Sequence, residues 1–316
     1  MTPHSGTPAI ENHQTSRRCD ACTRRSSEVG ESMLARAGHA QLWVLIEHPG
    51  PWPKSAPGAV LPDALVRRIE SAGGPVRLAL IRRPRDRNVV EPRWILAWSD
   101  GVRQWMREGT VAGYGDLVNL PFESSARGEE PDVGVARHSQ IFAVCTHGKK
   151  DACCAELGRP IVNALAAVDG ADVWECTHIG GDRFAANMIA LPAGLYFSRL
   201  GPESAVVTAR EVLSGRVPLG HLRGRAALSP SAQVAEHILR ERTGLDAIDA
   251  IEQVCETTTP DGSVAVDMRI AGRDYRVLVR QGPPEPAFRH GCVAETAVTW
   301  HRWIIDSVDE RSIADR

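Results

Sequence analysis

Two stretches decide the fold of this chain: Ile141-Phe-Ala-Val-Cys145-Thr-His-Gly-Lys-Lys-Asp-Ala-Cys153-Cys154 and Trp174-Glu-Cys176-Thr-His178-Ile-Gly-Gly-Asp182. Together they hold four of the eight cysteines and a histidine followed by two glycines. Thiolates and imidazoles are the ligands of zinc and of iron–sulfur clusters, and thiolates also carry out redox chemistry by themselves. The apolar run before Cys145 predicts a buried strand that delivers this cysteine at its C-terminal end.

The elements around these stretches predict an α/β domain. After the strand Gln140–Cys145, we expect a helix that begins at Pro160, a strand, a hairpin across Ala193-Gly194 and a closing helix. Their predicted ranges are 160–168, 173–176, 187–192, 195–200 and 203–214. The order β, α, β, β, β, α is that of a thioredoxin-like domain, and open α/β sheets place their sites at strand ends.

The flanking regions contain further strand and helix patterns. On the N-terminal side, we expect helices over 26–38 and 61–72 and strands over 41–47, 76–81 and 93–98, which together make a small α/β unit. On the C-terminal side, we expect helices over 229–242 and 294–307 and strands over 251–258, 264–270 and 275–279. No chemistry-bearing motif stands out in this last region.

Composition and charge exclude several classes of function. The chain has 316 residues and a formal net charge of −2, so we expect no general affinity for nucleic acid. We also expect no membrane span, because the longest apolar run, 187–197, is interrupted by Pro192 and Gly194. Residues 1–18 carry no secretory signal pattern, and the cysteines are too sparse for a disulfide scaffold. We therefore expect a reducing, cytoplasmic setting in which cysteines act as ligands.

The lysines are unevenly placed. Of the three lysines, Lys54, Lys149 and Lys150, two lie between Cys145 and Cys154. With Arg183, they predict a positive rim on which an acidic redox partner or reductase docks. A solvated loop explains the same two lysines equally well, and both interpretations stay open.

The spacing of the site residues resembles one known family. Cys145-x8-Cys154 followed by His178-x-Gly180-Gly181 is similar to the pattern C-x8-C…H-x-G-G-H of the sucrase/ferredoxin-like family, with the close match over 141–200. The resemblance implies a thioredoxin-like ferredoxin domain that binds one 2Fe–2S cluster. It also implies that Cys145 and Cys154 hold one iron and that His178 is a ligand of the other.

The fourth ligand position departs from the family pattern, because Asp182 stands where the pattern has histidine. A carboxylate can bind iron, although it is harder than the usual cluster ligands. Cys176 is the alternative, since it lies two residues before His178 and shares its face if the strand continues. Cys153 is a third candidate, but it is adjacent to Cys154 and we expect it to point away from the site. We expect either of the first two to lower the reduction potential relative to two histidines.

The predicted organisation follows from these observations. We expect a flexible leader over 1–18, an N-terminal α/β region over 19–123, a linker over 124–137, the thioredoxin-like ferredoxin domain over 138–216, a linker over 217–228 and a C-terminal α+β region over 229–316. The predicted function is electron transfer rather than catalysis on a substrate. The alternatives are a thiol–disulfide oxidoreductase that uses Cys153, Cys154 or Cys176, and an interaction module stabilised by zinc.

Five further residues are interpreted as having no role in the site. His147 is expected to be a solvent-facing loop residue, although Cys145-Thr-His147 repeats the order of Cys176-Thr-His178. The pair Cys19-x2-Cys22 supplies half of a zinc site and has no matching half in the sequence. Cys255 and Cys292 are expected to be small apolar side chains in or near strands.

Overall fold

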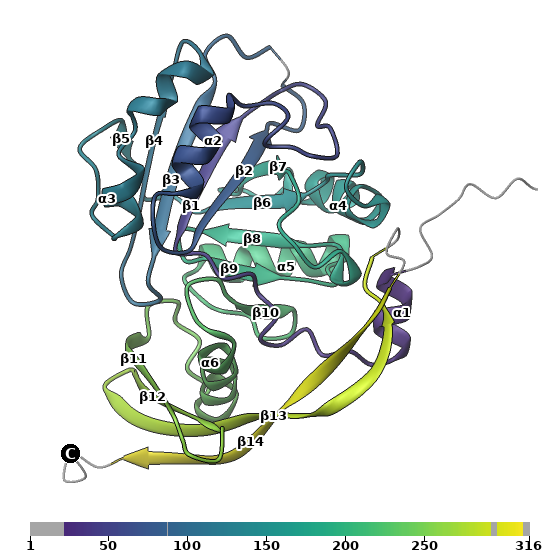
Figure 1. Cartoon of the computed structure of the whole chain (residues 1–316), viewed down its shortest axis with the longest axis vertical. Coiled ribbons are helices and arrows are strands. Elements are labelled where there is room, and N and C mark those ends of the chain that lie inside the picture. The colour runs from purple at the N-terminus through teal and green to yellow at the C-terminus, as the bar shows by residue number, and fades with distance from the viewer. Residues whose placement is uncertain (1–21, 87, 292–295, 312–316) are drawn as a thin grey trace, which may run out of the picture.

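The computed structural model describes residues 22–86, 88–291 and 296–311 (Figure 1). The predicted leader, together with Cys19 and Cys292, lies outside the described residues. Two sheets organise the chain. The larger has ten strands and the smaller has four.

The N-terminal part contributes four long strands and their helices to the larger sheet. Short apolar runs rich in Leu, Ile, Val and Trp form the strands over 42–47 and 93–99, as expected for strands buried on both faces. The elements are α1 (Cys22–Glu28), β1 (Leu42–Glu47), α2 (Asp63–Glu70), β2 (Val76–Arg82), β3 (Arg93–Ser99), β4 (Gln104–Thr110), a 3₁₀ helix (Tyr114–Asn119), α3 (Phe122–Ala126) and β5 (Val135–Ala136).

The middle part contains the two motif stretches and continues the same sheet. Its element order β, α, β, β, β, α confirms the order expected of a thioredoxin-like domain. The elements are β6 (Ile141–Cys145), α4 (Ala152–Leu165), β7 (Asp172–Cys176), a 3₁₀ helix (Asp182–Phe184), β8 (Met188–Leu191), β9 (Leu195–Phe197), α5 (Pro202–Leu213) and β10 (Leu222–Arg225).

The two parts repeat one arrangement of strands. In the N-terminal part, β1 pairs in parallel with β2 and antiparallel with β3, which pairs antiparallel with β4. In the middle part, β6, β7, β8 and β9 pair in the same way. The sheet order is β10-β9-β8-β6-β7-β2-β1-β3-β4-β5, so the antiparallel pairing of β2 with β7 joins the two units edge to edge.

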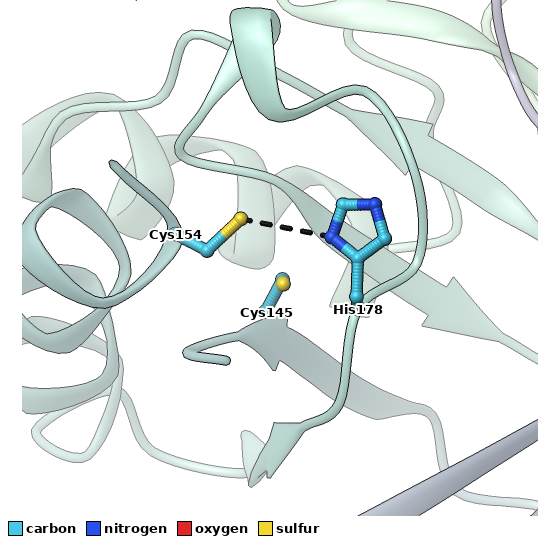
Figure 2. Close-up of side chains that lie close together, drawn as sticks. All are labelled: Cys145, Cys154 and His178. Atoms are coloured by element: carbon cyan, nitrogen blue, oxygen red, sulfur yellow. Dashed lines mark hydrogen bonds between the residues drawn. The ribbon is translucent and has the colours of Figure 1, made fainter. Parts of the chain in front are cut away.

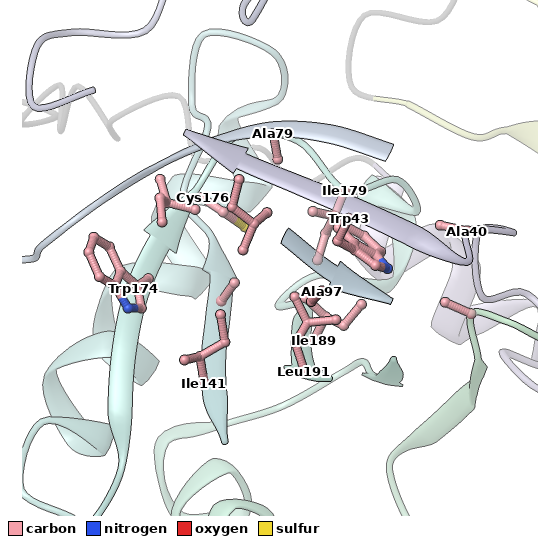
Figure 3. Packing of buried hydrophobic residues seen from close by; sticks show 14 of the residues in the cluster. Ala40, Trp43, Ala79, Ala97, Ile141, Trp174, Cys176, Ile179, Ile189 and Leu191 are labelled. Carbon is pink, nitrogen blue, oxygen red and sulfur yellow. The ribbon is translucent and has the colours of Figure 1, made fainter. Parts of the chain in front are cut away.

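Both units share one apolar core. Alternate side chains of the central strands, such as Trp43, Ile141 and Ile189, form a single buried cluster on one face of the sheet (Figure 3). The opposite faces pack separately, one against α2 and α3 and the other against α4 and α5. Cys145, Cys154 and Cys176 all belong to the shared cluster, so the motif residues lie at its edge.

The C-terminal part packs one helix on the smaller, antiparallel sheet. Its elements are α6 (Pro230–Thr243), β11 (Ile251–Thr258), β12 (Val264–Ile270), β13 (Arg273–Arg289) and β14 (Ala297–Arg311). The buried ion pair between Glu236 on α6 and Arg225 on β10 attaches this part to the larger sheet. Arg240, one turn further along α6, also pairs with Glu236. The long pair β13–β14 runs from below α6 towards α1 (Figure 1).

Three predicted helices differ from the structure. The helix predicted over 294–307 is wrong, because residues 297–311 form β14; this run is rich in Val, Thr, Trp and Ile and pairs with β13. The helix predicted to begin at Pro160 begins at Ala152 instead, since Asp151 caps it by accepting a hydrogen bond from the Cys153 amide. The helix predicted over 26–38 is wrong for most of its length, because α1 ends at Glu28 and residues 29–38 form turns and irregular structure.

No helix in the part of the chain that the structure describes has the length and apolar character needed to cross a membrane.

Candidate metal centre

Three elements bring Cys145, Cys154 and His178 together. Cys145 ends β6, Cys154 lies in the first turn of α4, and His178 follows β7, the strand beside β6. Their ligand atoms all lie within 4.8 Å of one another, and Nδ1 of His178 is 3.8 Å from Sγ of Cys154 (Figure 2). Both cysteines are fully buried, whereas the imidazole is partly exposed. The structure therefore brings together the three residues that the sequence motif predicted to share a site.

A glycine allows α4 to approach the end of β6. A Cβ atom at Gly158, one turn after Cys154, would lie 2.3 Å from the carbonyl oxygen of Cys145. Real Cβ atoms essentially never come this close to another atom. The distance between the two cysteines therefore depends on Gly158, which the sequence motif does not include.

The surroundings favour a negative charge on Cys145. The hydrogen bond from the Cys154 thiol lowers the pKa of Cys145 well below its usual range, although burial alone would raise it. Interactions with His178 and with the His147 amide lower this pKa further. The same hydrogen bond and burial raise the pKa of Cys154. The thiolate form of Cys145, the thiol of Cys154 and the ring of His178 thus share one buried site.

Asp182 contacts the other nitrogen of the His178 ring. Oδ1 of Asp182 lies 2.8 Å from Nε2 of His178. Burial disfavours the charged form of His178, but Asp182 and Cys145 outweigh it and raise the pKa of His178 to about 9. Burial also disfavours the charged form of Asp182 and by itself would raise its pKa. His178 outweighs burial and lowers the pKa of this carboxyl below its ordinary value. The carboxylate fixes the orientation of the ring, as carboxylates do beside metal-ligating histidines.

The loop after His178 is held by side chains that bond its main-chain carbonyls. Four successive carbonyl oxygens each accept one hydrogen bond from a different side chain. The bonds run from Arg77 to His178 (3.1 Å), from Tyr196 to Ile179 (3.0 Å), from Arg223 to Gly180 (3.0 Å) and from Asn187 to Gly181 (2.9 Å). Gly180 and Gly181 have φ angles of +92° and +79°. Residues other than glycine rarely adopt this backbone conformation.

His147 does not face solvent, so its interpretation as an exposed loop residue is wrong. Its side chain is 1% exposed, its Nε2 bonds the Pro53 carbonyl at 2.9 Å, and its Nδ1 accepts from the His178 amide at 3.4 Å. Burial lowers its pKa. His147 therefore helps to position His178 and is outside the three-residue ligand group.

The other candidate ligands lie outside this group. Cys176 pairs in register with Cys145 on the neighbouring parallel strand, and its side chain packs in the shared core (Figure 3). Burial raises the pKa of its thiol. Cys153 points to the opposite side of the α4 terminus, where its Sγ lies 3.5 Å from Sγ of Cys22. Cys255 lies in β11 but is exposed, contrary to the expected apolar packing.

The charged residues beside the site differ in their pairing. Lys149 and Lys150 are exposed in the turn between β6 and α4. Arg183, which was predicted to join them in a positive rim, instead forms an ion pair of 2.8 Å with the buried Glu31. The exposed positive charge in this turn thus comes from the two lysines.

The positioning residues carry little signal in the sequence. Arg77 and Arg223 lie far from the motif along the chain, whereas Asn187 and Tyr196 follow it closely. Sequence reasoning missed all four of these residues. The pair Gly180-Gly181 did indicate an unusual backbone, but it did not indicate which side chains would bond that backbone.

The donor set suits a metal centre of mixed ligation. Two thiols and an imidazole are ligands of zinc and of iron in iron–sulfur proteins, and the lowered pKa of Cys145 supplies a thiolate. Comparison with curated proteins and with solved structures gives no match. Residues 33–224, which are more than half of the chain and include all the motif residues, match the profile of the family described as Sucrase/ferredoxin-like. The chain therefore belongs to the sucrase/ferredoxin-like family.

Proposed function

We propose that this protein transfers electrons through one 2Fe–2S cluster bound at Cys145, Cys154 and His178. The observation that carries the proposal is the meeting of two buried cysteines and one histidine, with their ligand atoms within 4.8 Å, at adjacent strand ends. The family pattern supports the choice of cluster, since it pairs C-x8-C with H-x-G-G. When bound, a 2Fe–2S cluster accepts and releases single electrons.

The chain offers the following ligands. Cys145 and Cys154 hold one iron through their thiolates, and His178 holds the other through Nδ1, the ring nitrogen that faces Cys154. We assign the fourth position to Asp182, which is in register with the family pattern, and keep Cys176 as its alternative. Either residue adds a negative charge that a second histidine would not, so the reduction potential is lower than that of a site with two histidines.

The residues around the ligands also affect the energy of an added electron. Arg77 and Arg223 bond the carbonyls of the ligand loop, and Arg223 is almost fully buried. Burial lowers the pKa of Arg223 to about 10, so its side chain still carries a positive charge at neutral pH. Buried positive charge stabilises an electron added nearby, and so offsets part of the lowering of the reduction potential by Asp182.

The exposed lysines indicate where a partner binds. Lys149 and Lys150 precede the helix that carries Cys154 and are exposed to solvent. We propose that a reductase or redox protein with an acidic surface docks there, because complementary charge accelerates association. A cytoplasmic location belongs to the same proposal, since reducing compartments preserve free thiols for metal binding.

The test is metal and sulfide analysis of anaerobically purified protein, with visible and EPR spectra before and after dithionite. We expect iron and acid-labile sulfide in equal amounts and a rhombic EPR signal that appears only on reduction. A colourless protein with a redox-titratable thiol pair would instead establish a thiol–disulfide oxidoreductase. Zinc at Cys145 and Cys154 without iron would establish an interaction module stabilised by zinc.

A further inference from the structure

A second group of metal-binding side chains lies on the other side of the α4 terminus. The ligand atoms of Cys22, Asp151 and Cys153 lie within 4.8 Å of one another, and all three residues are buried. Cys22 belongs to α1, whereas Asp151 and Cys153 form the N-cap and first turn of α4. The two sulfur atoms are 3.5 Å apart although 131 positions separate the residues in the sequence.

We propose that Cys22, Cys153 and Asp151 bind one structural Zn²⁺ ion. Two thiolates on a tetrahedral zinc, each at about 2.3 Å, lie roughly 3.8 Å from each other, close to the spacing found here. Asp151 accepts a hydrogen bond from the Cys153 amide through Oδ1, and a carboxylate has enough lone pairs to cap a helix and bind a cation together. Both thiols lose their protons to solvent when the metal binds.

The sequence supports the same site from the N-terminal side. Cys22 ends the spacing Cys19-x2-Cys22, which is the chelating spacing of many zinc sites and which lacked a matching half in the sequence. Asp151 and Cys153 supply that half. Cys19 lies outside the described residues, and the proposal does not depend on it.

The metal would fix α1 against the ligand helix. A helix of seven residues is too short to be stable by itself, and among the described residues Cys22 shares its small apolar cluster with Cys153 and Ala185. Cys153 is the neighbour of Cys154, and Ala185 follows the 3₁₀ helix that begins at Asp182. A zinc ion here would therefore tie α1 to both segments that carry candidate ligands of the first site.

The experiment measures zinc and iron separately in the full chain. We expect about one zinc per chain in the wild type, loss of most of that zinc in Cys22→Ser and Asp151→Asn, and little change of iron in either variant. Cys145→Ser should show the converse. Cys255→Ser is the matched control, because it makes the same chemical change at an exposed cysteine of β11 and should alter neither metal.

A second measurement does not depend on the folding of a variant. Cobalt offered to zinc-depleted wild type should give thiolate-to-cobalt charge-transfer absorption that zinc abolishes. Absence of zinc from the wild type, retention of zinc by Cys22→Ser, or recovery of Cys22 and Cys153 in one disulfide-linked peptide would overturn the zinc site. Iron and sulfide test the electron-transfer proposal and zinc tests this one, so each can fail by itself.

Discussion

Nε2 of His178 lies 2.8 Å from Oδ1 of Asp182, while Nδ1 of the same ring lies 3.8 Å from Sγ of Cys154. The imidazole thus has one nitrogen directed at the cysteines and the other at a carboxylate. A carboxylate in this position orients the ring and makes it a stronger donor. Asp182, which stands where the family pattern has its second histidine, therefore also contacts His178, the first histidine of that pattern.

The cysteine ligands give the first prediction. Cys145→Ser or Cys154→Ser should remove nearly all iron and sulfide, because a hydroxyl is a poor ligand compared with a thiolate and the site has no spare donor within its ligand group. Metal analysis and the visible spectrum measure the loss. A brown, reducible protein that survives either change would refute the assignment of these ligands.

The second prediction concerns the fourth ligand. Asp182→Asn should weaken metal binding by at least the roughly 10–100-fold that follows loss of a carboxylate beside a ligating histidine. Asp182→His restores the family pattern and should keep the cluster at a higher reduction potential, because a neutral ligand replaces a charged one. Potentiometric titration followed by EPR measures the shift.

Cys176→Ser is the comparison for this second prediction. We expect it to keep iron and sulfide at wild-type levels, since Cys176 lies outside the group of Cys145, Cys154 and His178. If Cys176→Ser loses the cluster while Asp182→Asn retains it, the fourth ligand is Cys176.

The third prediction tests the close approach of α4 to β6. Gly158→Ala places a Cβ atom 2.3 Å from the Cys145 carbonyl oxygen, and this backbone atom cannot rotate away. We expect a loss of about 1–3 kcal/mol in the free energy of unfolding, together with weaker metal binding. Chemical denaturation and metal analysis measure these effects. Asn163→Ala, at an exposed position of the same helix, should change stability by less than about 0.5 kcal/mol.

The fourth prediction separates the two glycines of the ligand loop. Both have positive φ, so alanine at either should cost about 1–2 kcal/mol in backbone strain. At Gly181, the new Cβ would also lie 2.4 Å from a guanidinium nitrogen of Arg223, whereas the nearest such atom at Gly180 is 3.9 Å away. Gly181→Ala should therefore displace Arg223 and lose more stability and metal than Gly180→Ala. Equal losses in denaturation and metal content would contradict this role of Arg223.

The fifth prediction concerns the two buried ion pairs of Glu236, of which the pair with Arg225 joins α6 to the larger sheet. Glu236→Gln leaves Arg225 and Arg240 without their carboxylate, and should cost about 3–5 kcal/mol at pH 7. Asp306→Asn removes a more exposed partner, that of Arg280, and should cost less than about 1 kcal/mol. Urea denaturation of the two variants compares these costs.

The effect of Glu236 should depend on pH. Burial raises the pKa of Glu236, but the two guanidinium groups outweigh it and lower the pKa below the ordinary value of 4.5. Its stabilising contribution is therefore complete above pH 4.5 and is lost as the pH falls through the lower pKa of the folded state. The stability difference between wild type and Glu236→Gln should shrink in this acidic range. A difference that grows on acidification would contradict the direction of the shift.

The sequence by itself determined the local features of this protein. Apolar runs that end at Cys145 and Cys176 predict the buried strands β6 and β7, and the H-x-G-G pattern predicts a special loop at His178. These features depend on residues close together in the chain, where side-chain periodicity and spacing limit the backbone to few conformations. For the same reason, the predicted hairpin across Ala193-Gly194 is confirmed as β8 and β9.

Only the tertiary structure decided which distant segments meet. The pairing of β2 with β7 joins two similar units into one sheet, the pairing with β13 makes residues 297–311 a strand, and packing buries His147. Cys22 meets Cys153 across 131 positions. Such contacts depend on the packing of whole elements, and neither spacing nor periodicity records them, because many distant pairings satisfy the same local pattern.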